Sequence, residues 1–116
     1  MTGLRAKDVV LAQQARADLD ALGRRRGKEA ASIARRAHVL REVLLADCLH
    51  GEVVRKARIP PALAMEFGLQ NLYVEDLPSF WRLLYTVVKD DGARYVVVLR
   101  IVDHATHSGW LPGRNA

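Results

Sequence analysis

Basic and imidazole side chains gather in the last third of the chain, in and after two apolar segments. Arg82 lies in FWRLLYTVV and Arg100 lies in RYVVVLRIV, and His104 and His107 follow the second segment. A guanidinium can neutralise the charge that develops on a phosphate in a transition state, and an imidazole can transfer protons near neutral pH. These residue types therefore favour a site suited to a phosphodiester.

Both segments have the β-branched and aromatic composition of strands, and the KDDG between them contains an Asp-Gly pair typical of a hairpin turn. Side chains alternate between the two faces of a strand. We therefore expect Arg82, Arg100 and His104 to share one open face of the hairpin. The apolar side chains of the other face are expected to pack against helices: Trp81, Leu83, Tyr85, Val87, Val97, Leu99 and Ile101.

Two further cations are expected on this open face. Lys56 and Arg58 lie in EVVRKARIP, a strand candidate that ends at Pro60 and Pro61 and is expected to join the same sheet. Antiparallel sheets often have one solvated face, so these cations can also be plain surface residues. Taken together, a concave face lined by Arg, Lys and His favours RNA as the ligand. Cleavage there needs neither a metal nor another cofactor if the ribose 2′-hydroxyl is the nucleophile.

The elements that must position these residues begin near the N-terminus. Residues 9–11 form a short apolar run suited to a first strand. Residues 12–22 carry an apolar stripe at helical spacing, which Gly23 is expected to end. The basic sequence RRRGK connects this helix to a second one, whose stripe covers residues 33–48 and which Gly51 is expected to end.

The remaining strands follow these helices. NLYVEDL is a short strand candidate between EVVRKARIP and the hairpin segments. The order is one strand, two helices and then three or four strands. This order predicts a single α+β domain over residues 1–116, with two N-terminal helices packed on a twisted antiparallel sheet of about four strands.

The composition limits the class of partner. With 50% hydrophobic and 27% charged residues, the 116-residue chain is expected to fold around one core. A formal charge of +5 favours an anionic partner, although a basic solvated surface gives the same total. Cys48 is the only cysteine, which rules out an intrachain disulfide. Because no apolar run has the length of a signal peptide or a membrane span, we expect a cytoplasmic protein without a membrane partner.

Several stretches, in the same order, resemble the RelE/ParE superfamily of toxins from bacterial and archaeal type II toxin–antitoxin modules. VVLAQQARADLDAL resembles the opening strand and first helix of that family, GEVVRKARIP its second strand, and LPSFWRLLYTV its Trp-Arg strand. The resemblance covers nearly the whole chain and implies a RelE-like fold of two helices on a four-stranded sheet. It also implies an mRNA interferase that cuts messages in the ribosomal A site and is blocked by a cognate antitoxin.

The resemblance carries over to individual residues. Arg82 matches the catalytic arginine of the family's third strand, and His104 or His107 matches the proton-transfer residue near the end of the last strand. Lys56 and Arg58 match the basic residues of the second strand and, with Arg100 on the expected open face, are predicted to bind the RNA phosphate. Many close relatives have a tyrosine where His107 stands, so the choice between His104 and His107 stays open.

Other interpretations fit some of the same residues. The family also includes gyrase poisons, so a ParE-like, non-nucleolytic toxin that binds a protein such as DNA gyrase is the alternative function, and an inactive homologue is a third. Asp103, His104 and His107 could bind zinc, but no fourth ligand is apparent and no metal is expected. His104 could instead cap the sheet through a hydrogen bond. Trp81 is expected in the core, and Trp110 in contact with bases or with the antitoxin.

Overall fold

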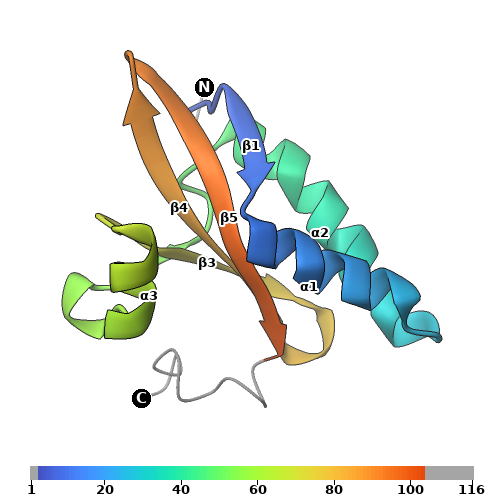
Figure 1. Ribbon diagram of the computed structural model, residues 1–116. Helices are drawn as coiled ribbons and strands as arrows, with labels where there is room; N and C mark the ends of the chain where they lie inside the picture. The colour runs from blue at the N-terminus through green and yellow to red at the C-terminus, as the bar shows by residue number, and fades with distance from the viewer. Residues whose placement is uncertain (1–2, 104–116) are drawn as a thin grey trace.

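The computed structural model describes residues 3–103 of the chain. These residues form three helices, two short 3-10 turns and a five-stranded sheet (Figure 1). In chain order the elements are β1 (Asp8–Leu11), α1 (Gln13–Arg24), α2 (Lys28–Ala46), β2 (Glu52–Val53), η1 (Lys56–Arg58), α3 (Pro61–Phe67), β3 (Tyr73–Leu77), η2 (Pro78–Phe80), β4 (Trp81–Asp90) and β5 (Ala93–Asp103).

The strands lie in the order β1-β5-β4-β3-β2. All neighbouring strands are antiparallel except β1 and β5, which run parallel. The α+β class with helices packed on a sheet is thus confirmed, whereas the sheet has five strands rather than about four and is mixed rather than antiparallel. Alternating apolar residues identify a strand, but they do not specify which distant strand becomes its neighbour or in which direction the pair runs.

A tight turn joins β4 and β5 into the long central hairpin of the sheet. Asp91 and Gly92 form this two-residue turn, with φ angles of 51° and 81°. Positive φ at both positions is what a type I′ turn requires, and the twist of such a turn matches that of the flanking strands. The turn predicted from KDDG is confirmed.

A β-bulge interrupts this hairpin near its middle. Leu84 pairs with Arg100 whereas Tyr85 pairs with Val98, so Leu99 is an extra residue in β5. The bulge breaks the alternation of β5, since Val97 and Leu99 pack on one face of the sheet whereas Ile101 packs on the other. The prediction that Val97 and Leu99 share with Ile101 the face that packs against the two N-terminal helices is therefore wrong, because strict alternation does not hold across a bulge.

The main hydrophobic core lies between one face of the sheet and helices α1 and α2. The apolar stripes of α1 and α2 are buried here, and α3 is a third helix beyond the two that the sequence predicted. Trp81 packs at the border of this core, as expected. Its fully buried residues include Ala15, Leu22, Ile33, Leu40, Leu44, Tyr85, Val96, Val98 and Ile101.

A second, smaller core covers the opposite face of the sheet. It joins Leu63 of α3 to Leu72, Val74, Leu84, Leu99 and Val102. The open sheet face predicted from Arg82, Leu84 and Thr86 is wrong at its centre, since Leu84 is completely buried and Thr86 nearly so. The sequence prediction omitted α3, which begins at Pro61 and ends at Gly68 in the left-handed conformation.

Two other element boundaries differ from the prediction. Only Glu52–Val53 of the predicted strand EVVRKARIP pairs in the sheet, and the chain then turns into η1. Helix α2 ends at Ala46 instead of Gly51, because the side chain of Asp47 accepts hydrogen bonds from the backbone N–H groups of Leu4 and Leu49. Over the part of the chain that the structure describes, no helix is long and apolar enough to span a membrane.

Candidate active site

Arg82 lies at the beginning of β4, where the strand leaves η2. It pairs with Asp76 of β3 and Val102 of β5, on the face of the second core. Its side chain is only 13% exposed, and its Nε lies 3.9 Å from Oδ1 of Asp76, which is 56% exposed. At this distance the pair is electrostatic rather than a direct hydrogen bond. The guanidinium is therefore held at the rim of the sheet, beside a carboxylate that solvent can screen.

The two candidate proton-transfer residues lie outside the described residues. The last described strand ends at Asp103, which pairs with Trp81, and His104 and His107 come after it. The register thus brings the end of β5 beside the beginning of β4. The proton-transfer roles of His104 and His107 remain predictions.

Arg100 is held in a partly buried ion pair with α1. Its Nε lies 2.7 Å and its Nη2 3.1 Å from the two carboxylate oxygens of Asp18, and the side chains are 18% and 13% exposed. The backbone N–H of Ile101 donates to the same carboxylate at 2.9 Å. The Asp18 carboxylate thereby binds the edge of β5 at Ile101, beyond the residues of β5 that pair with β1. The ion pair with Asp18 explains where the Arg100 side chain lies, and it gives Arg100 a structural role. A contact between Arg100 and an RNA phosphate is not needed to explain this position.

Lys56 and Arg58 lie in η1 rather than in a strand. Both side chains are exposed, and η1 follows β2, the strand at the far edge of the sheet from β1. Their expected place on one strand face beside Arg82 is therefore wrong, because the chain leaves the sheet after Val53. Lys56 and Arg58 can still bind an anion at the surface, but strand pairing does not bring them to Arg82.

A histidine–carboxylate pair that the sequence prediction missed ties the chain after α2 to β3. Nδ1 of His50 lies 2.6 Å from Oε2 of Glu75, whose side chain is 8% exposed, while that of His50 is 47% exposed. Glu75 pairs with Leu83 and so lies on the face of the main core, opposite to Arg82. The sequence feature that could have indicated this pair is the glutamate in the middle of NLYVEDL, since a buried carboxylate in a strand needs a partner.

Tyr85 and Gly51 form a close contact next to this pair. The phenol oxygen of Tyr85 accepts a hydrogen bond of 2.9 Å from the backbone N–H of Gly51, and a Cβ on Gly51 would lie 2.8 Å from that oxygen. Tyr73 stacks on the Tyr85 ring at 5.2 Å. Burial raises the pKa of the Tyr85 phenol well above its ordinary value, and the Gly51 hydrogen bond opposes this only in part. Tyr85 is therefore a neutral structural group and not a proton donor at neutral pH.

Cys48 has the properties of a core residue rather than a nucleophile. It is completely buried, and its backbone N–H donates to the carbonyl of Leu4 at 2.7 Å. Burial also raises the pKa of the thiol, which disfavours the reactive thiolate. Cys48 lies just beyond the end of α2 and belongs to the main core.

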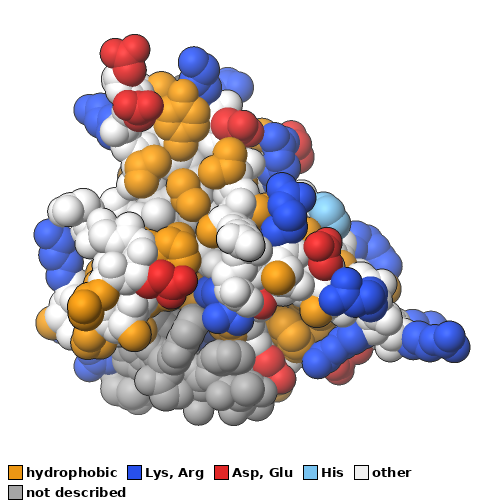
Figure 2. All heavy atoms as spheres, in the orientation of Figure 1, with side chains coloured by type: hydrophobic (Ala, Val, Ile, Leu, Met, Phe, Trp, Pro, Cys, Tyr) orange, Lys and Arg blue, Asp and Glu red, His pale blue; other side chains and the backbone are white. Residues whose placement is uncertain are grey.

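Lysine and arginine side chains are spread over the surface rather than gathered at Arg82. Figure 2 shows a group of them at the tip where α1 meets α2, which corresponds to the RRRGK sequence. Arg55 and Lys56 are exposed at the other edge of the sheet. Charge alone therefore does not locate the site, and the partly buried position of Arg82 is the more specific signal.

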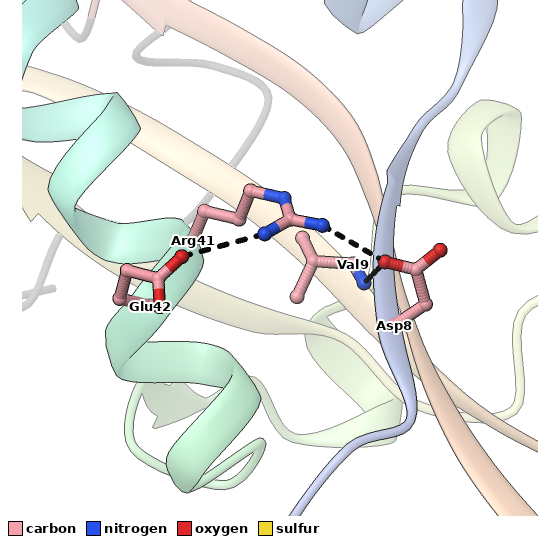
Figure 3. Close-up of polar contacts among 4 residues, drawn as sticks. All are labelled: Asp8, Val9, Arg41 and Glu42. Atoms are coloured by element: carbon pink, nitrogen blue, oxygen red, sulfur yellow. Dashed lines mark hydrogen bonds and ion pairs between the residues drawn. The ribbon is translucent and has the colours of Figure 1, made fainter.

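A cavity of about 380 Å³ lies between β1, α1 and α2. Apolar side chains from the main core line much of it, with Arg16 and His38 among its polar residues. Nη2 of Arg41 lies 3.0 Å from Oδ1 of Asp8, which also accepts a hydrogen bond from the backbone N–H of Val9 at 2.8 Å (Figure 3). This cavity lies on the opposite face of the sheet from Arg82 and is separate from the candidate active site.

Comparisons of the chain with protein-family models, with curated proteins and with solved structures found no match.

Proposed function

We propose that this chain is the toxin of a type II toxin–antitoxin module, of the RelE-like type, and that it is a metal-independent endoribonuclease acting on messenger RNA at the ribosome. The observation that carries the proposal is the position of Arg82. Its guanidinium is partly buried at the rim of the sheet, and it lies beside the strand end that leads to His104 and His107. A cation held in this way can stabilise charge without reorganising during the reaction.

The reaction needs few protein groups. The ribose 2′-hydroxyl attacks the adjacent phosphorus, the bond to the 5′-oxygen breaks, and the products are a 2′,3′-cyclic phosphate and a 5′-hydroxyl. In the proposal Arg82 neutralises the charge on the equatorial oxygens. His104 or His107 moves a proton at the nucleophile or at the leaving oxygen. Lys56 and Arg58 bind phosphates away from the scissile bond, while Arg100 positions β5 through Asp18.

The proposed partners follow from the same chemistry. The substrate is messenger RNA on the ribosome, and the inhibitor is a cognate antitoxin with an acidic segment, because the net charge of the toxin is +5. A cytoplasmic location belongs to this proposal, since ribosomes and nascent messages are found there.

One observation favours the non-nucleolytic alternative, a ParE-like toxin that binds a protein such as DNA gyrase. Of the cations predicted to line one face, Arg100 lies on the face of Arg82 by strand register but is paired with Asp18, and Lys56 and Arg58 lie in η1. A toxin that acts by binding needs no such cluster.

Induction of the protein in cells separates the two functions. Primer extension on messages from induced cells should reveal cuts phased with codons, without induction of a DNA-damage reporter. A DNA-damage response without message cleavage would support the gyrase-type function instead. Growth inhibition should disappear when a cognate antitoxin is expressed together with the toxin.

A further inference from the structure

The connection between β3 and β4 displays an aromatic ring in an unusual backbone conformation. Ser79 has φ 61° and ψ 34°, and Phe80 has φ 65°, so two consecutive residues other than glycine adopt the left-handed region. The side chain of Phe80 is 82% exposed. Left-handed conformations are unfavourable for such residues and cluster at functional sites. The strained backbone thus holds a large apolar ring in solvent. Burial of the ring therefore does not offset the energetic cost of the strain.

The same end of the molecule carries the basic turn between α1 and α2. The guanidinium of Arg25 lies 5.4 Å from the ring centre of Trp81, the residue after Phe80, and η2 packs against α2. Arg24, Arg26 and Lys28 of this turn are exposed. Figure 2 shows this group of cations at the tip formed by α1 and α2. The exposed ring and the basic turn therefore belong to one surface, which we call the Phe80 surface (residues 24–28 and 80).

The chemistry of this surface fits a single-stranded nucleic acid better than a protein. Protein interfaces use contiguous apolar patches, whereas the Phe80 surface offers one ring beside several cations. A ring stacks on a base, and nearby arginines and lysines contact the phosphates. The guanidinium of Arg25 already lies over an aromatic ring, 5.4 Å from the ring centre of Trp81, so a cation and an aromatic ring meet at this surface.

We propose that the Phe80 surface binds single-stranded RNA, with Phe80 stacked on a base and the exposed cations of the turn in contact with phosphates. The inference rests on the proposed function, because it extends the RNA path from the candidate active site. Only Trp81 separates Phe80 from Arg82 in the chain, so their Cα atoms lie at most about 7 Å apart. A base stacked on Phe80 would therefore hold the strand next to Arg82.

Fluorescence anisotropy with a labelled single-stranded RNA of twelve uridines tests this surface directly. The measurement uses an Arg82→Ala background so that cleavage is slow, and no ribosomes are present. Phe80→Ala should weaken binding by roughly 5- to 100-fold, and Phe80→Trp should retain it. The matched control is Met65→Ala, which removes a side chain that is 85% exposed on α3 and should leave the affinity unchanged.

A second pair of variants tests the contribution of charge. The double substitution Arg24→Ala with Arg26→Ala should lower the slope of log K against log salt concentration by about 1 to 1.5, as expected for two lost phosphate contacts on a single strand. The double substitution Arg35→Ala with Arg36→Ala removes the same charge from exposed positions on α2 and should change the slope much less.

Three outcomes would overturn the inference. These are equal affinities for the Phe80→Ala and parent proteins, equal losses for Phe80→Ala and Met65→Ala, or Phe80-dependent binding of an acidic peptide with no binding of the RNA. If binding is indifferent to Phe80 while the wild-type protein still cleaves messages on ribosomes, only this surface assignment fails. If no message cleavage is found, the proposed function fails independently of the anisotropy result.

Discussion

At the scale of single residues, the pair of His50 and Glu75 shows how a polar group is accommodated in a buried strand. His50→Ala would leave the carboxylate of Glu75, 8% exposed, without its partner at 2.6 Å. We expect the free energy of unfolding to fall by about 1–3 kcal/mol, the cost of leaving a buried polar group without its hydrogen-bond partner. Urea denaturation measures the change. His38→Ala removes an exposed histidine from α2 and serves as the control. Equal effects of the two substitutions would contradict a stabilising role for the pair.

The raised pKa of the Tyr85 phenol predicts how the free energy of unfolding depends on pH in alkaline solution. Burial raises the pKa of its phenol above the ordinary value of 10.0, so the unfolded chain loses this proton at lower pH than the folded protein. The contribution to stability is fully present below pH 10 and is lost as the pH rises from there toward the folded pKa. The free energy of unfolding should fall in this window by about 1.4 kcal/mol per pH unit from this group alone.

Tyr85→Phe isolates this effect because it removes the titrating group and leaves the other titrating groups in place. At neutral pH the variant should be about 1–2 kcal/mol less stable, since the buried N–H of Gly51 loses its acceptor. Above pH 10 the two stability curves should converge. Parallel curves in urea titrations from pH 9 to 11 would show that Tyr85 does not titrate differently in the folded state.

At the scale of elements, α1 acts as a cover for the edge of β5. Asp18 accepts hydrogen bonds from the Arg100 guanidinium and from the N–H of Ile101. Asp18→Ala should lower the free energy of unfolding by about 2–4 kcal/mol, because a buried cation and an edge amide both lose their partner. Asp20→Ala removes an exposed acid from the same helix and should change stability by less than about 0.5 kcal/mol. Similar thermal unfolding of both variants would contradict this assignment.

The elements that could be predicted are those whose signal is local. The turn at Asp91 and Gly92, the two long strands around it and the stripes of α1 and α2 depend on neighbouring residues, and all of them are found in the structure. The parallel pairing of β1 with β5 and the bulge at Leu99 depend on distant partners. Helix α3 is too short to display a helical period, so the covered second face of the sheet was missed.

The candidate site was predictable to a similar extent. Arg82 was selected from its strand and from the sequence resemblance. The structure confirms the strand and the partly buried position of its side chain, and its catalytic role stays a prediction. The role of Arg100 depends on Asp18, which lies in a distant element, and no local pattern indicates that contact. The His50–Glu75 pair likewise joins two segments that are distant in the sequence.

At the scale of the whole molecule, one sheet separates two chemically different sides. Helices α1 and α2 cover one face with the larger core, and α3 covers part of the other (Figure 1). Arg82 lies on the side of α3, at the end of the sheet where β4 begins and β5 ends. Phe80 lies at the same end, directly before Trp81, whose ring lies under Arg25 of the basic turn. The proposal therefore assigns RNA binding to this end of the molecule and structural roles to the buried polar groups elsewhere.

The central claim is that Arg82 is a catalytic residue of a ribosome-dependent endoribonuclease. The most direct test measures message cleavage on purified ribosomes programmed with a defined message, using wild-type, Arg82→Ala and Lys89→Ala proteins whose folding is checked by circular dichroism. Wild-type protein and the Lys89→Ala control, changed at an exposed residue of the same strand, should cut at equal rates. Arg82→Ala should cut roughly 10²- to 10³-fold more slowly. Cleavage by folded Arg82→Ala at the wild-type rate would contradict the account.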